Sequence, residues 1–457
     1  MTGPLLAFYG DDFTGASAVM EVLAFAGIPT VMFLRPPTDA DLARFPNLGA
    51  VGIAGIARSR DPDWMEQNLP QAFAALARFG APVMHYKVCS TFDSAPGRGS
   101  IGKAIDIGAP LLGGAWHPMI VAAPAIRRYQ AFGQLFAGTD DGVFRLDRHP
   151  VMRRHPTTPM DEADLRLHLA RQTNRAIGLV DFTQIKSGHA DDALAQALAK
   201  GAEVVAIDVL DDETLTEAGR LAWNDGKGPV FAIGSQGVEY ALVAWWRATG
   251  LLPASFETPK LLPVPQIFCV SGSCSPVNAA QIAAAEAHGF HVVALDAAEA
   301  VAAPAWQAAL SRCLTQSLAA LGNGRDVLVA TARGPDDPAL SRVRDAVTAS
   351  GQNPGAVNDA IGAGLGFLVA EVRRRTGISR MAVAGGDTSG HAMTALGATA
   401  LSARAPLAPG APLCLVHSTT PAIDGLEVTL KGGQMGSRTF FIEAKLGHEM
   451  QRPPSSV

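Results

Sequence analysis

A single stretch, residues 381–390 with the sequence MAVAGGDTSG, constrains the fold of this chain more than any other. Its apolar start, residues 381–384, predicts a short buried strand, and the two glycines that follow allow a tight turn. Residues 387–389 are good helix N-cap residues, so we expect a helix over residues 391–396. A strand, turn and helix of this kind present free N–H groups and the positive end of a helix dipole to an anion. The stretch therefore indicates a phosphate site, with an ordinary strand-to-helix loop as the alternative.

The length of the chain exceeds what one ordinary hydrophobic core accommodates. Its 457 residues predict two domains of roughly 200 residues each. Hydrophobic residues make up 48% and charged residues 17%, a balance that permits large cores and argues against disorder. The net charge is −5, and basic residues gather only in short groups, which argues against nucleic acid as a partner.

The sequence also bears on cellular location. The most apolar long window, residues 109–126, is interrupted by glycines, a histidine and prolines, so it predicts no membrane span. The chain runs into a strand at residue 5 without the pattern of a signal peptide. The five cysteines form no C-x-x-C pair, and their odd number suits a reducing compartment. We expect a cytoplasmic protein with no membrane partner, and the sequence leaves a homo-oligomer open.

The first half begins with a strand over residues 5–9, followed by the segment GDDFTGA and a helix over residues 17–26. Ligands of open α/β sheets bind at the carboxyl ends of the strands, where this unit places Asp11 and Asp12. One aspartate suffices to cap the helix. The second is then available for binding a ligand or for catalysis.

Two further predicted strands end in polar residues. The strand over residues 50–57 ends in Arg58-Ser59-Arg60, and a guanidinium at that edge suits bidentate capture of a carboxylate, with a solvated surface arginine as the alternative. The strand over residues 83–87 ends at Lys87, which can neutralise an anion. The loop that follows carries side chains suited to a sugar, or to a purely structural hydrogen-bonded loop: Ser90, Thr91, Asp93 and Ser94.

The rest of this half adds polar segments and more strand–helix units. Residues 124–133 include two arginines that could reach the same edge. Residues 143–159 predict an excursion from the core with His149 and His155 at the surface, and a helix is predicted from Met160 to Gln172. Strands are then predicted over residues 176–180, 204–209 and 230–233.

A linker and a second domain follow. Residues 251–266 contain four prolines and lack helical periodicity, so we predict domains over residues 1–250 and 267–457. Small-residue turns follow predicted strands at residues 271–275 and 432–436, in addition to the turn after residue 384. The converging backbone amides of three such turns suit a polyphosphate.

In their order along the chain, these motifs resemble the four-carbon acid sugar kinase family. The matching motifs are DDxTGA at residues 11–16, KxxSTxxS at 87–94, SGS at 271–273, GGDTS at 385–389 and KxGxxG at 431–436. The resemblance implies two Rossmann-like α/β domains with a cleft between them, the first binding an acid sugar and the second a nucleotide. It also implies contacts with ATP at Ser271, Gly385, Gly386, Asp387, Thr388 and Gly433.

Within that family, residues 86–94 and 155–160 are most similar to the 3-oxo-tetronate kinase branch. Two segments depart from it: the loop at residues 95–100 is longer, and residues 125–130 replace the usual Gly-Arg-containing segment. Because both lie on the substrate side, a branched acid such as 3-oxo-isoapionate stays open, as does threonate or erythronate.

The resemblance implies ATP-dependent phosphorylation of the terminal hydroxyl of a small sugar acid. We expect Arg60 and Lys87 to hold the substrate carboxylate. Asp12, with Asp11 or Asp93 as its rival, is expected to orient or deprotonate the attacking hydroxyl. Mg²⁺ is expected to bridge the phosphates, with Asp387 touching it directly or through water and no residue assigned as a metal ligand.

Two other classes of protein are weighed against this one. A nicotinamide-dependent dehydrogenase would need a G-x-G-x-x-G fingerprint, which the sequence lacks. A non-catalytic, nucleotide-dependent sugar-acid sensor would bind the same ligands without releasing ADP.

Overall fold

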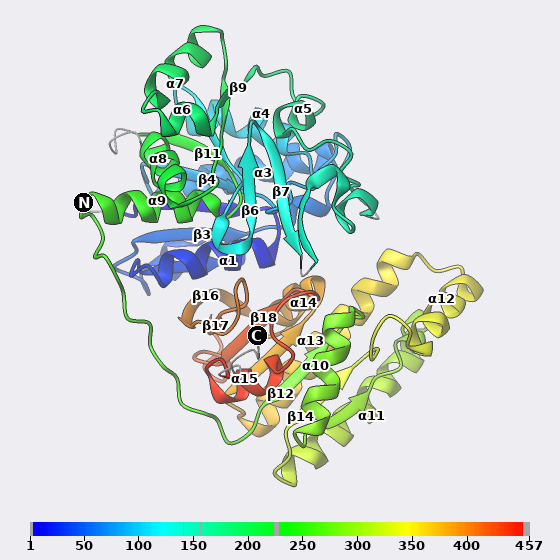
Figure 1. Ribbon diagram of the computed structural model, residues 1–457. Helices are drawn as coiled ribbons and strands as arrows, with labels where there is room; N and C mark the ends of the chain where they lie inside the picture. The colour runs from blue at the N-terminus through cyan, green and yellow to red at the C-terminus, as the bar shows by residue number, and fades with distance from the viewer. Residues whose placement is uncertain (1–2, 140, 156, 224–227, 451–457) are drawn as a thin grey trace, which may run out of the picture. The chain divides into compact units, whose positions relative to one another are not determined.

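The structure of the chain, a computed structural model, describes residues 3–139, 141–155, 157–223 and 228–450, apart from the side chain of Asp387. The chain divides into two compact units, Met1–Glu257 and Thr258–Val457 (Figure 1). Each unit is a sheet accompanied by helices, which confirms the predicted α/β class. Residues 251–266 contain no helix or strand. The exact domain limits stay a prediction.

The sheet of the first unit is parallel throughout. In spatial order, its described strands are β2 (Thr30–Phe33), β3 (Ala50–Ala54), β1 (Leu6–Gly10), β4 (Val83–Lys87), β11 (Val230–Gly234), β5 (His117–Ile120), β10 (Val204–Ile207) and β9 (Ile177–Val180). The central strands are buried along their length, as their apolar runs predict. Gly10 pairs in register with both Ala54 and Lys87. The carboxyl ends of β3, β1 and β4 therefore meet at one edge of the sheet.

Two groups of helices pack on this sheet. One group contains α1 (Phe13–Ala24), α8 (Asp212–Trp223) and α9 (Gly237–Ala248), which contact one another. The other contains α3 (Pro62–Ala77) and α4 (Ile101–Leu112). Because α1 and α3 both pack on β1, the two groups cover opposite faces, as in a doubly wound fold. The helices predicted to follow β1 and β4 are both present.

A small antiparallel sheet is added to the first unit. Its strands are β6 (Arg128–Ala131), β7 (Gln134–Thr139) and β8 (Gly142–Arg145). The carboxylate of Asp208, just after β10, accepts hydrogen bonds from the backbone N–H groups of Phe132 and Gly133 and so fixes the turn between β6 and β7. This sheet was not predicted, because its strands are short and mostly half-buried.

Two local predictions in this region were wrong. His149 is buried, because its Nδ1 accepts the backbone N–H groups of Val151 and Met152 and so closes a tight turn. The helix predicted up to Gln172 is reduced to α5 (Leu165–Leu169). It begins late because Asp164 is its N-cap.

The second unit has a mixed sheet. In spatial order, its described strands are β13 (His291–Ala294), β14 (Val327–Ala330), β12 (Phe268–Ser271), β15 (Arg380–Ala384), β18 (Glu427–Lys431), β17 (Leu413–Ser418) and β16 (Ala398–Ala405). The first five are parallel, whereas β17 and β16 are antiparallel to their neighbours. The parallel part places the three predicted turns, after β12, β15 and β18, on adjacent strands.

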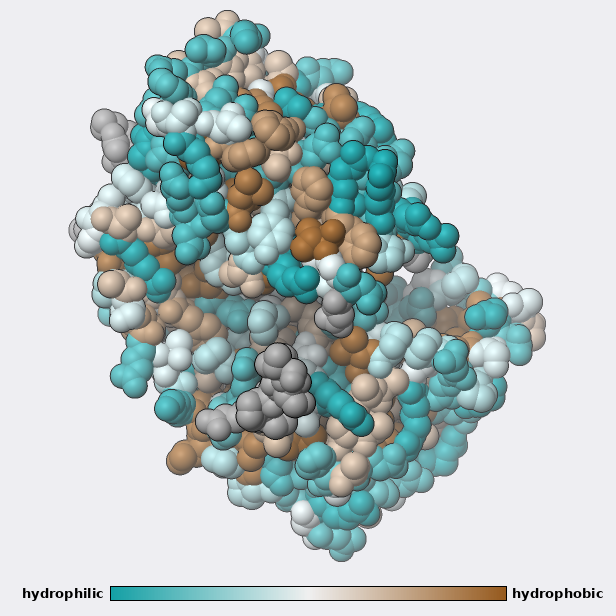
Figure 2. All heavy atoms as spheres, viewed as in Figure 1, coloured by the Kyte–Doolittle hydropathy of each residue, from teal (hydrophilic) through white to brown (hydrophobic). Residues whose placement is uncertain are grey.

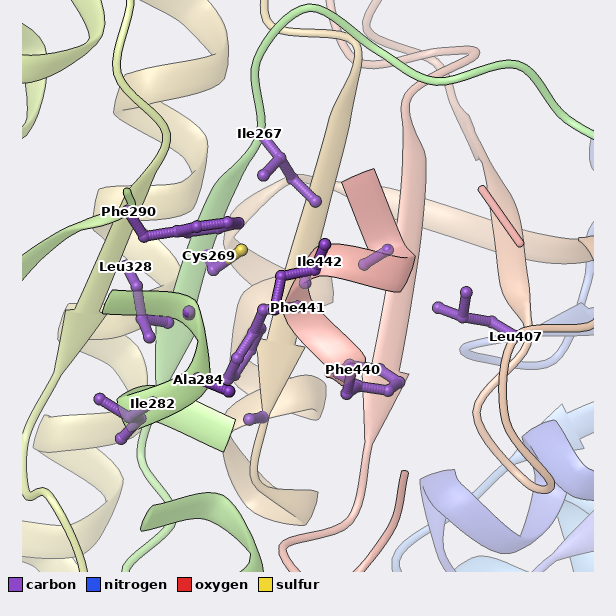
Figure 3. Close-up of a cluster of buried hydrophobic side chains, with 14 of the residues drawn as sticks. Ile267, Cys269, Ile282, Ala284, Phe290, Leu328, Leu407, Phe440, Phe441 and Ile442 are labelled. Carbon is purple, nitrogen blue, oxygen red and sulfur yellow. The ribbon is translucent and has the colours of Figure 1, made fainter. Parts of the chain in front are cut away.

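The core of this unit lies between the sheet and two helices, α10 (Pro276–Ala287) and α15 (Phe440–Leu446). Phe440, Phe441 and Ile442 of α15 belong to one buried cluster with Ile282 of α10 and Cys269 of β12 (Figure 3). Of the remaining helices, α13 (Pro354–Thr376) contacts both α11 (Ala303–Gly322) and α14 (Gly386–Ala395). Helix α12 (Pro338–Ser350) packs on the 3₁₀ turn Ala297–Val301, which also contacts α11 and α13. The rings of Phe440 and Phe441 contact each other edge to face, with their centres 5.7 Å apart.

Helix α13 is, among the described residues, the one helix long and apolar enough to cross a membrane. Of its most apolar window, 56% is buried within the unit, and it packs along α14 and α11. A core helix satisfies the same criteria. Hydrophilic side chains cover most of the face drawn in Figure 2, with hydrophobic ones scattered among them.

Candidate functional site

The first unit gathers charged side chains at the edge where β1, β3 and β4 end. Asp11 and Asp12 follow β1 directly, Arg58 lies on a short 3₁₀ turn (Ala57–Ser59) after β3, and Lys87 is the last residue of β4. The backbone holds the turn in place, because the N–H of Arg58 donates to the carbonyl of Asp11 at 2.9 Å. Strand order and register thus bring together residues that are 76 positions apart in the sequence, from 11 to 87.

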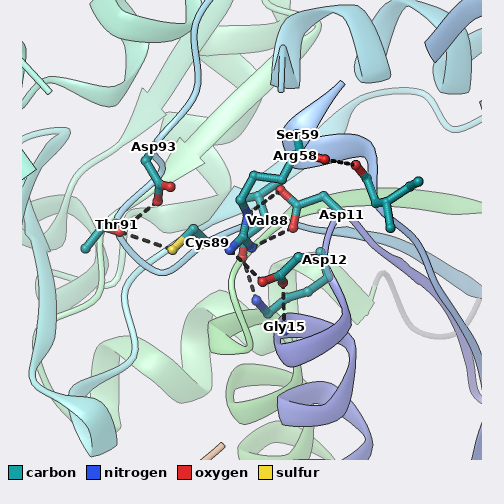
Figure 4. Close-up of polar contacts among 12 residues, drawn as sticks. Asp11, Asp12, Gly15, Arg58, Ser59, Val88, Cys89, Thr91 and Asp93 are labelled. Atoms are coloured by element: carbon teal, nitrogen blue, oxygen red, sulfur yellow. Dashed lines mark hydrogen bonds and ion pairs between the residues drawn. The ribbon is translucent and has the colours of Figure 1, made fainter. Parts of the chain in front are cut away.

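Arg58 binds both aspartates (Figure 4). Its Nη2 and Nε donate to the two oxygens of Asp11 at 2.6 and 3.2 Å, and its Nη1 donates to Oδ2 of Asp12 at 2.8 Å. The bidentate contact with Asp11 has the fork geometry that favours arginine over lysine. The sequence indicated both Arg58 and Arg60 at this edge, and the structure brings Arg58 to the aspartates.

Asp12 has a second task. Its Oδ1 accepts the N–H of Gly15 at 2.7 Å, so Asp12 is the N-cap of α1. The side chain of Asp12 is 30% exposed, whereas that of Asp11 is 3% exposed. One aspartate therefore caps the helix, as the plainer interpretation required, and the other is buried behind it.

The electrostatics of the cluster follow from this burial. Burial raises the pKa of Asp11 to about 6, because loss of water outweighs the opposing charge of Arg58, and the negative charge of Asp12 adds to the rise. Burial alone would lower the pKa of Arg58, yet the charges of Asp11 and Asp12 hold it well above its usual range. Arg58 therefore stays a cation, and Asp11 is the group of this pair whose charge changes near neutral pH.

Lys87 lies against the same cluster. It is 2% exposed, and its Nζ donates to the carbonyl of Val88 at 2.6 Å. A Cβ placed on Gly15 would lie 2.4 Å from Oδ1 of Asp12 and 3.0 Å from Nζ of Lys87. The glycine of the DDxTGA motif is therefore required by the close approach of both side chains.

The loop after β4 adds a third carboxylate. Oγ1 of Thr91 donates to Oδ1 of Asp93 at 2.9 Å and lies 3.1 Å from Sγ of Cys89. Burial works to raise the pKa of Asp93, but the charge of Arg58 and the hydrogen bonds from Cys89 and Thr91 outweigh it, so this pKa is lowered. Asp93 is thus ionised and interacts with Arg58. Burial also raises the pKa of Cys89 to about 11, so this thiol is not a nucleophile at neutral pH.

Two predicted substrate residues are less closely tied to this cluster. Arg60 is exposed, and its guanidinium carbon lies 5.6 Å from the ring centre of Trp64. Ser90 is half-buried in the loop after β4. Their roles stay a prediction. In the sequence, Arg58 differs from Arg60 in lying two residues closer to the end of the preceding strand.

The second unit brings its three small-residue turns together. The N–H of Gly272 donates to the carbonyl of Ala384, and the N–H of Gly385 donates to the carbonyl of Lys431, both at 2.9 Å. A Cβ on Gly272 would lie 2.3 Å from Oγ1 of Thr388, and one on Gly433 would lie 2.4 Å from Oγ of Ser273. The turns pack against one another through positions where a side chain has no room.

The turn after β15 differs from its prediction in one respect. Helix α14 begins at Gly386, and its N-cap is Gly385, not one of residues 387–389. The reason is that Gly385 has φ of 128°, a conformation that favours glycine, which lets the helix start at once. The cap makes no side-chain hydrogen bond, so the first N–H groups of α14 are left for a ligand. The side chain of Asp387 lies outside the described part of the structure.

Ser271, the last residue of β12, is fully buried beneath these turns. Its Oγ accepts hydrogen bonds from Nδ2 of Asn278 at 2.8 Å and from the N–H of Ser273 at 3.4 Å. Oγ of Ser275 donates to the carbonyl of Gly433, which joins the first and third turns. Asn278, in the first turn of α10, was not predicted as a site residue.

Among the side chains that the structure describes, no group of three or more histidines, cysteines, aspartates or glutamates is arranged to hold a metal ion.

Comparison with known proteins identifies the class. Residues 6–242 match the family described as Sugar-binding N-terminal domain, and residues 268–441 match the family described as Nucleotide-binding C-terminal domain. The first match alone covers more than half of the chain. The chain therefore belongs to the four-carbon acid sugar kinase family, whose motifs it carries.

Individual relatives narrow this class. The 3-oxo-isoapionate kinase of Paraburkholderia graminis is 50% identical over 443 residues, which cover 96% of this chain and 93% of that protein. The 3-oxo-tetronate kinase of Methylobacterium radiotolerans is 32% identical, covering 95% and 97%. That of Burkholderia multivorans is 30% identical, covering 96% of each.

Solved structures agree on the fold. A Salmonella typhimurium LT2 protein, crystallised under the description of a tRNA synthase, superposes with a TM-score of 0.78 at 24% identity and covers 96% of this chain and 98% of its own. A Haemophilus influenzae protein superposes with a TM-score of 0.72 at 22% identity, covering 96% and 99%. At these identities the likeness shows the fold alone.

Proposed function

We propose that the chain is an ATP-dependent kinase that phosphorylates the terminal hydroxyl of a small 3-oxo sugar acid. The observation that carries the proposal is the presence in one chain of two different sites at the carboxyl edges of parallel strands. One is the charged cluster around Arg58, and the other is the set of glycine turns around Gly385. The first suits a hydroxy acid, and the second suits a polyphosphate.

The choice among sugar acids follows the relatives. Identity to the 3-oxo-isoapionate kinase is 50%, against 32% and 30% for the two 3-oxo-tetronate kinases. This favours a branched 3-oxo acid as the substrate, with 3-oxo-tetronate next and threonate or erythronate last. The longer loop at residues 95–100 lies on the substrate side and is consistent with a bulkier acid.

Lys87 is better placed than Arg58 to hold the substrate carboxylate. The guanidinium of Arg58 is already bound to two aspartates, so its charge is neutralised. The ammonium of Lys87 makes one hydrogen bond within the described part of the chain, to the carbonyl of Val88, and keeps two donors. Arg60 would act from the exposed rim, with Ser90 and Thr91 binding sugar hydroxyls.

Asp12 is the best candidate for the residue that orients or deprotonates the attacking hydroxyl. A base must come within hydrogen-bond distance of that hydroxyl. Asp12 is the most exposed of the three carboxylates, whereas Asp11 and Asp93 are buried and are held by Arg58 or Thr91. Asp11 and Asp93 would then act by holding Arg58, which fixes the position of Asp12.

ATP would bind at the second unit. The free N–H groups at the start of α14, with Gly385, Gly386 and Thr388, would hold phosphate oxygens, and the turns containing Ser271 and Gly433 would close the cradle. Mg²⁺ would arrive bound to the phosphates, where it neutralises charge, and Asp387 would contact it directly or through water. A cytoplasmic location, domain closure around the reactants and a homo-oligomer complete the proposal.

A coupled assay of ADP release over a panel of acids tests this function. The panel contains a branched 3-oxo acid, 3-oxo-tetronate, threonate and erythronate, each with ATP and Mg²⁺. We expect ADP release that depends on the acid and is largest for the branched 3-oxo acid. Binding of ATP and acid without ADP release would instead establish the sugar-acid sensor and contradict the kinase.

A further inference from the structure

Lys431, the last residue of β18, is a fully buried cation in the second unit. Its Nζ lies 3.3 Å from Oδ1 of Asn278 and 3.5 Å from the carbonyl of Gly432. The ring centres of Phe440 and Phe441 lie 5.6 and 6.0 Å from Nζ. Among the described side chains, no carboxylate lies within ion-pair distance of this ammonium.

A buried ammonium without a counter-ion is unfavourable. Burial lowers the pKa of Lys431 to about 8. The elements packed beside it carry described charged groups with other partners, and the side chain of Asp387 on α14 lies outside the described part of the structure. These pairs are Glu286 with Arg333, Arg380 with Glu427, His391 with Asp359, Lys445 with Asp326, and Glu443 with Ser437 and Thr439. None of the described side chains therefore compensates the positive charge of Lys431.

A chain of hydrogen bonds joins Lys431 to the turns. When Lys431 is charged its Nζ can only donate, so it selects the oxygen of the Asn278 amide, and Nδ2 of Asn278 points the other way. That nitrogen donates to Oγ of Ser271 at 2.8 Å and to the carbonyl of Ser273 at 2.9 Å. Oγ of Ser271 thus acts as an acceptor toward the protein interior, which leaves its own proton free to donate.

We propose that Lys431 is a positioning residue and the charge-compensating group of the nucleotide site, so that binding of a nucleoside polyphosphate at the three turns draws a proton onto it. This inference rests on the proposed function, because it requires the nucleotide to bind at those turns. The phosphates supply the negative charge that the protein lacks. The charged lysine in turn holds Asn278, and through it the turn of Ser271, in the binding conformation.

The direction of the proton exchange follows from linkage. In the free protein the pKa of about 8 lies below the usual 10.5, so burial favours the neutral amine. A nearby anion favours the charged form and raises the pKa. At pH 8, binding should therefore take up to about half a proton per site. At pH 6.5 the lysine is already charged, and little uptake is expected.

Titration calorimetry of the full chain with Mg-ADP, in HEPES and in Tris at pH 8, measures this uptake. Wild type should show a binding enthalpy that depends on the buffer. Lys431→Met should bind about 10-fold more weakly at pH 7 and show no uptake, and the ratio should narrow above pH 8. Lys431→Arg should recover affinity without uptake. The exposed Lys260→Met is the matched control and should resemble wild type.

A second variant keeps the test decisive if Lys431→Met unfolds. Asn278→Asp retains the lysine and places a carboxylate beside it, so the lysine should be charged before ADP binds, and uptake should vanish. Uptake and affinity that persist in both variants would overturn the role of Lys431. If wild type bound no ADP at all, the proposed function would fail instead, which is a distinct result.

Discussion

The two candidate sites occupy equivalent places, the carboxyl edges of parallel strands, yet they are built from different parts of the chain. In the first unit, side chains from three strand ends hold one another, with Arg58 between Asp11 and Asp12. In the second unit, glycines bring the main chain of three turns together, and the buried Lys431 lies at the end of β18 beside them. A side-chain cluster can recognise one small acid and transfer a proton. A main-chain cradle suits phosphates, and it depends on the absence of Cβ atoms.

The largest expected effect concerns the side-chain site. Asp12→Asn should lower kcat by about 100-fold or more, because the amide cannot accept the hydroxyl proton. Steady-state ADP release measures it, and ADP affinity should be unchanged. The exposed Asp63→Asn in the same unit is the control. Near-normal turnover in Asp12→Asn would remove this residue from the role and make Asp93 the stronger candidate.

The next effect is on stability. Arg58→Met leaves the buried Asp11 without its partner, so the first unit should lose about 3 kcal/mol, the lower end for breaking a buried pair, because Arg58 is 24% exposed. Urea unfolding measures it. Arg35→Met is the matched control, since its pair with Asp41 is nearer the surface and is worth about 1 kcal/mol or less. Equal losses in both variants would show that the Arg58 cluster has no special structural role.

Alanine variants of two glycines, one in each unit, distinguish the two sites. Gly272→Ala should displace Thr388 and weaken ADP binding by about 10-fold, with little change in the KM for the acid. Gly15→Ala should displace Asp12 and Lys87, which should raise the KM for the acid with little change in ADP affinity. Gly390→Ala, where a Cβ meets open space within α14, should leave both constants unchanged. If each variant altered both constants equally, the assignment of one ligand to each unit would be wrong.

The smallest effect is a dependence on pH. The pKa of Asp11 in the folded protein, about 6, lies above the usual 3.8, so folding favours its protonated form. The ionised Asp11 therefore destabilises the folded protein. This destabilisation is complete above pH 6 and disappears as the pH falls toward 4. The charge that neutralises Arg58 is lost over the same range, so kcat/KM should fall about twofold at pH 6. Asp11→Asn should lack this acidic limb, and a limb that persisted in this variant would belong to another group.

The comparison also explains what the sequence could reveal. The glycine turns are local motifs, so residues 271–275, 385–389 and 432–436 could be recognised and correctly placed after β12, β15 and β18. The charged cluster depends on strand order. Asp11, Asp12 and Lys87 were recognised because each lies at a strand end, but the preference of the aspartates for Arg58 over Arg60 depends on the 3₁₀ turn after β3.

Other features lay beyond the sequence for physical reasons. Asn278 is an ordinary polar residue within α10, and only the fold brings it to Lys431 and Ser271. His149 reads as a surface residue, yet it is buried because backbone N–H groups use its ring as an acceptor. The start of α14 was misplaced, because a glycine with positive φ replaced the side-chain cap that the pattern predicted.

Hydrogen exchange of the full chain, measured with each ligand separately, tests the central claim most directly. With Mg-ADP, the account predicts protection of backbone amides in residues 271–275, 385–389 and 432–436, and none in residues 11–15. With the sugar acid alone, residues 11–15 and 87–94 should be protected and the three turns should not. Protection by ADP at the edge of β1, or by the acid at the glycine turns, would contradict the account.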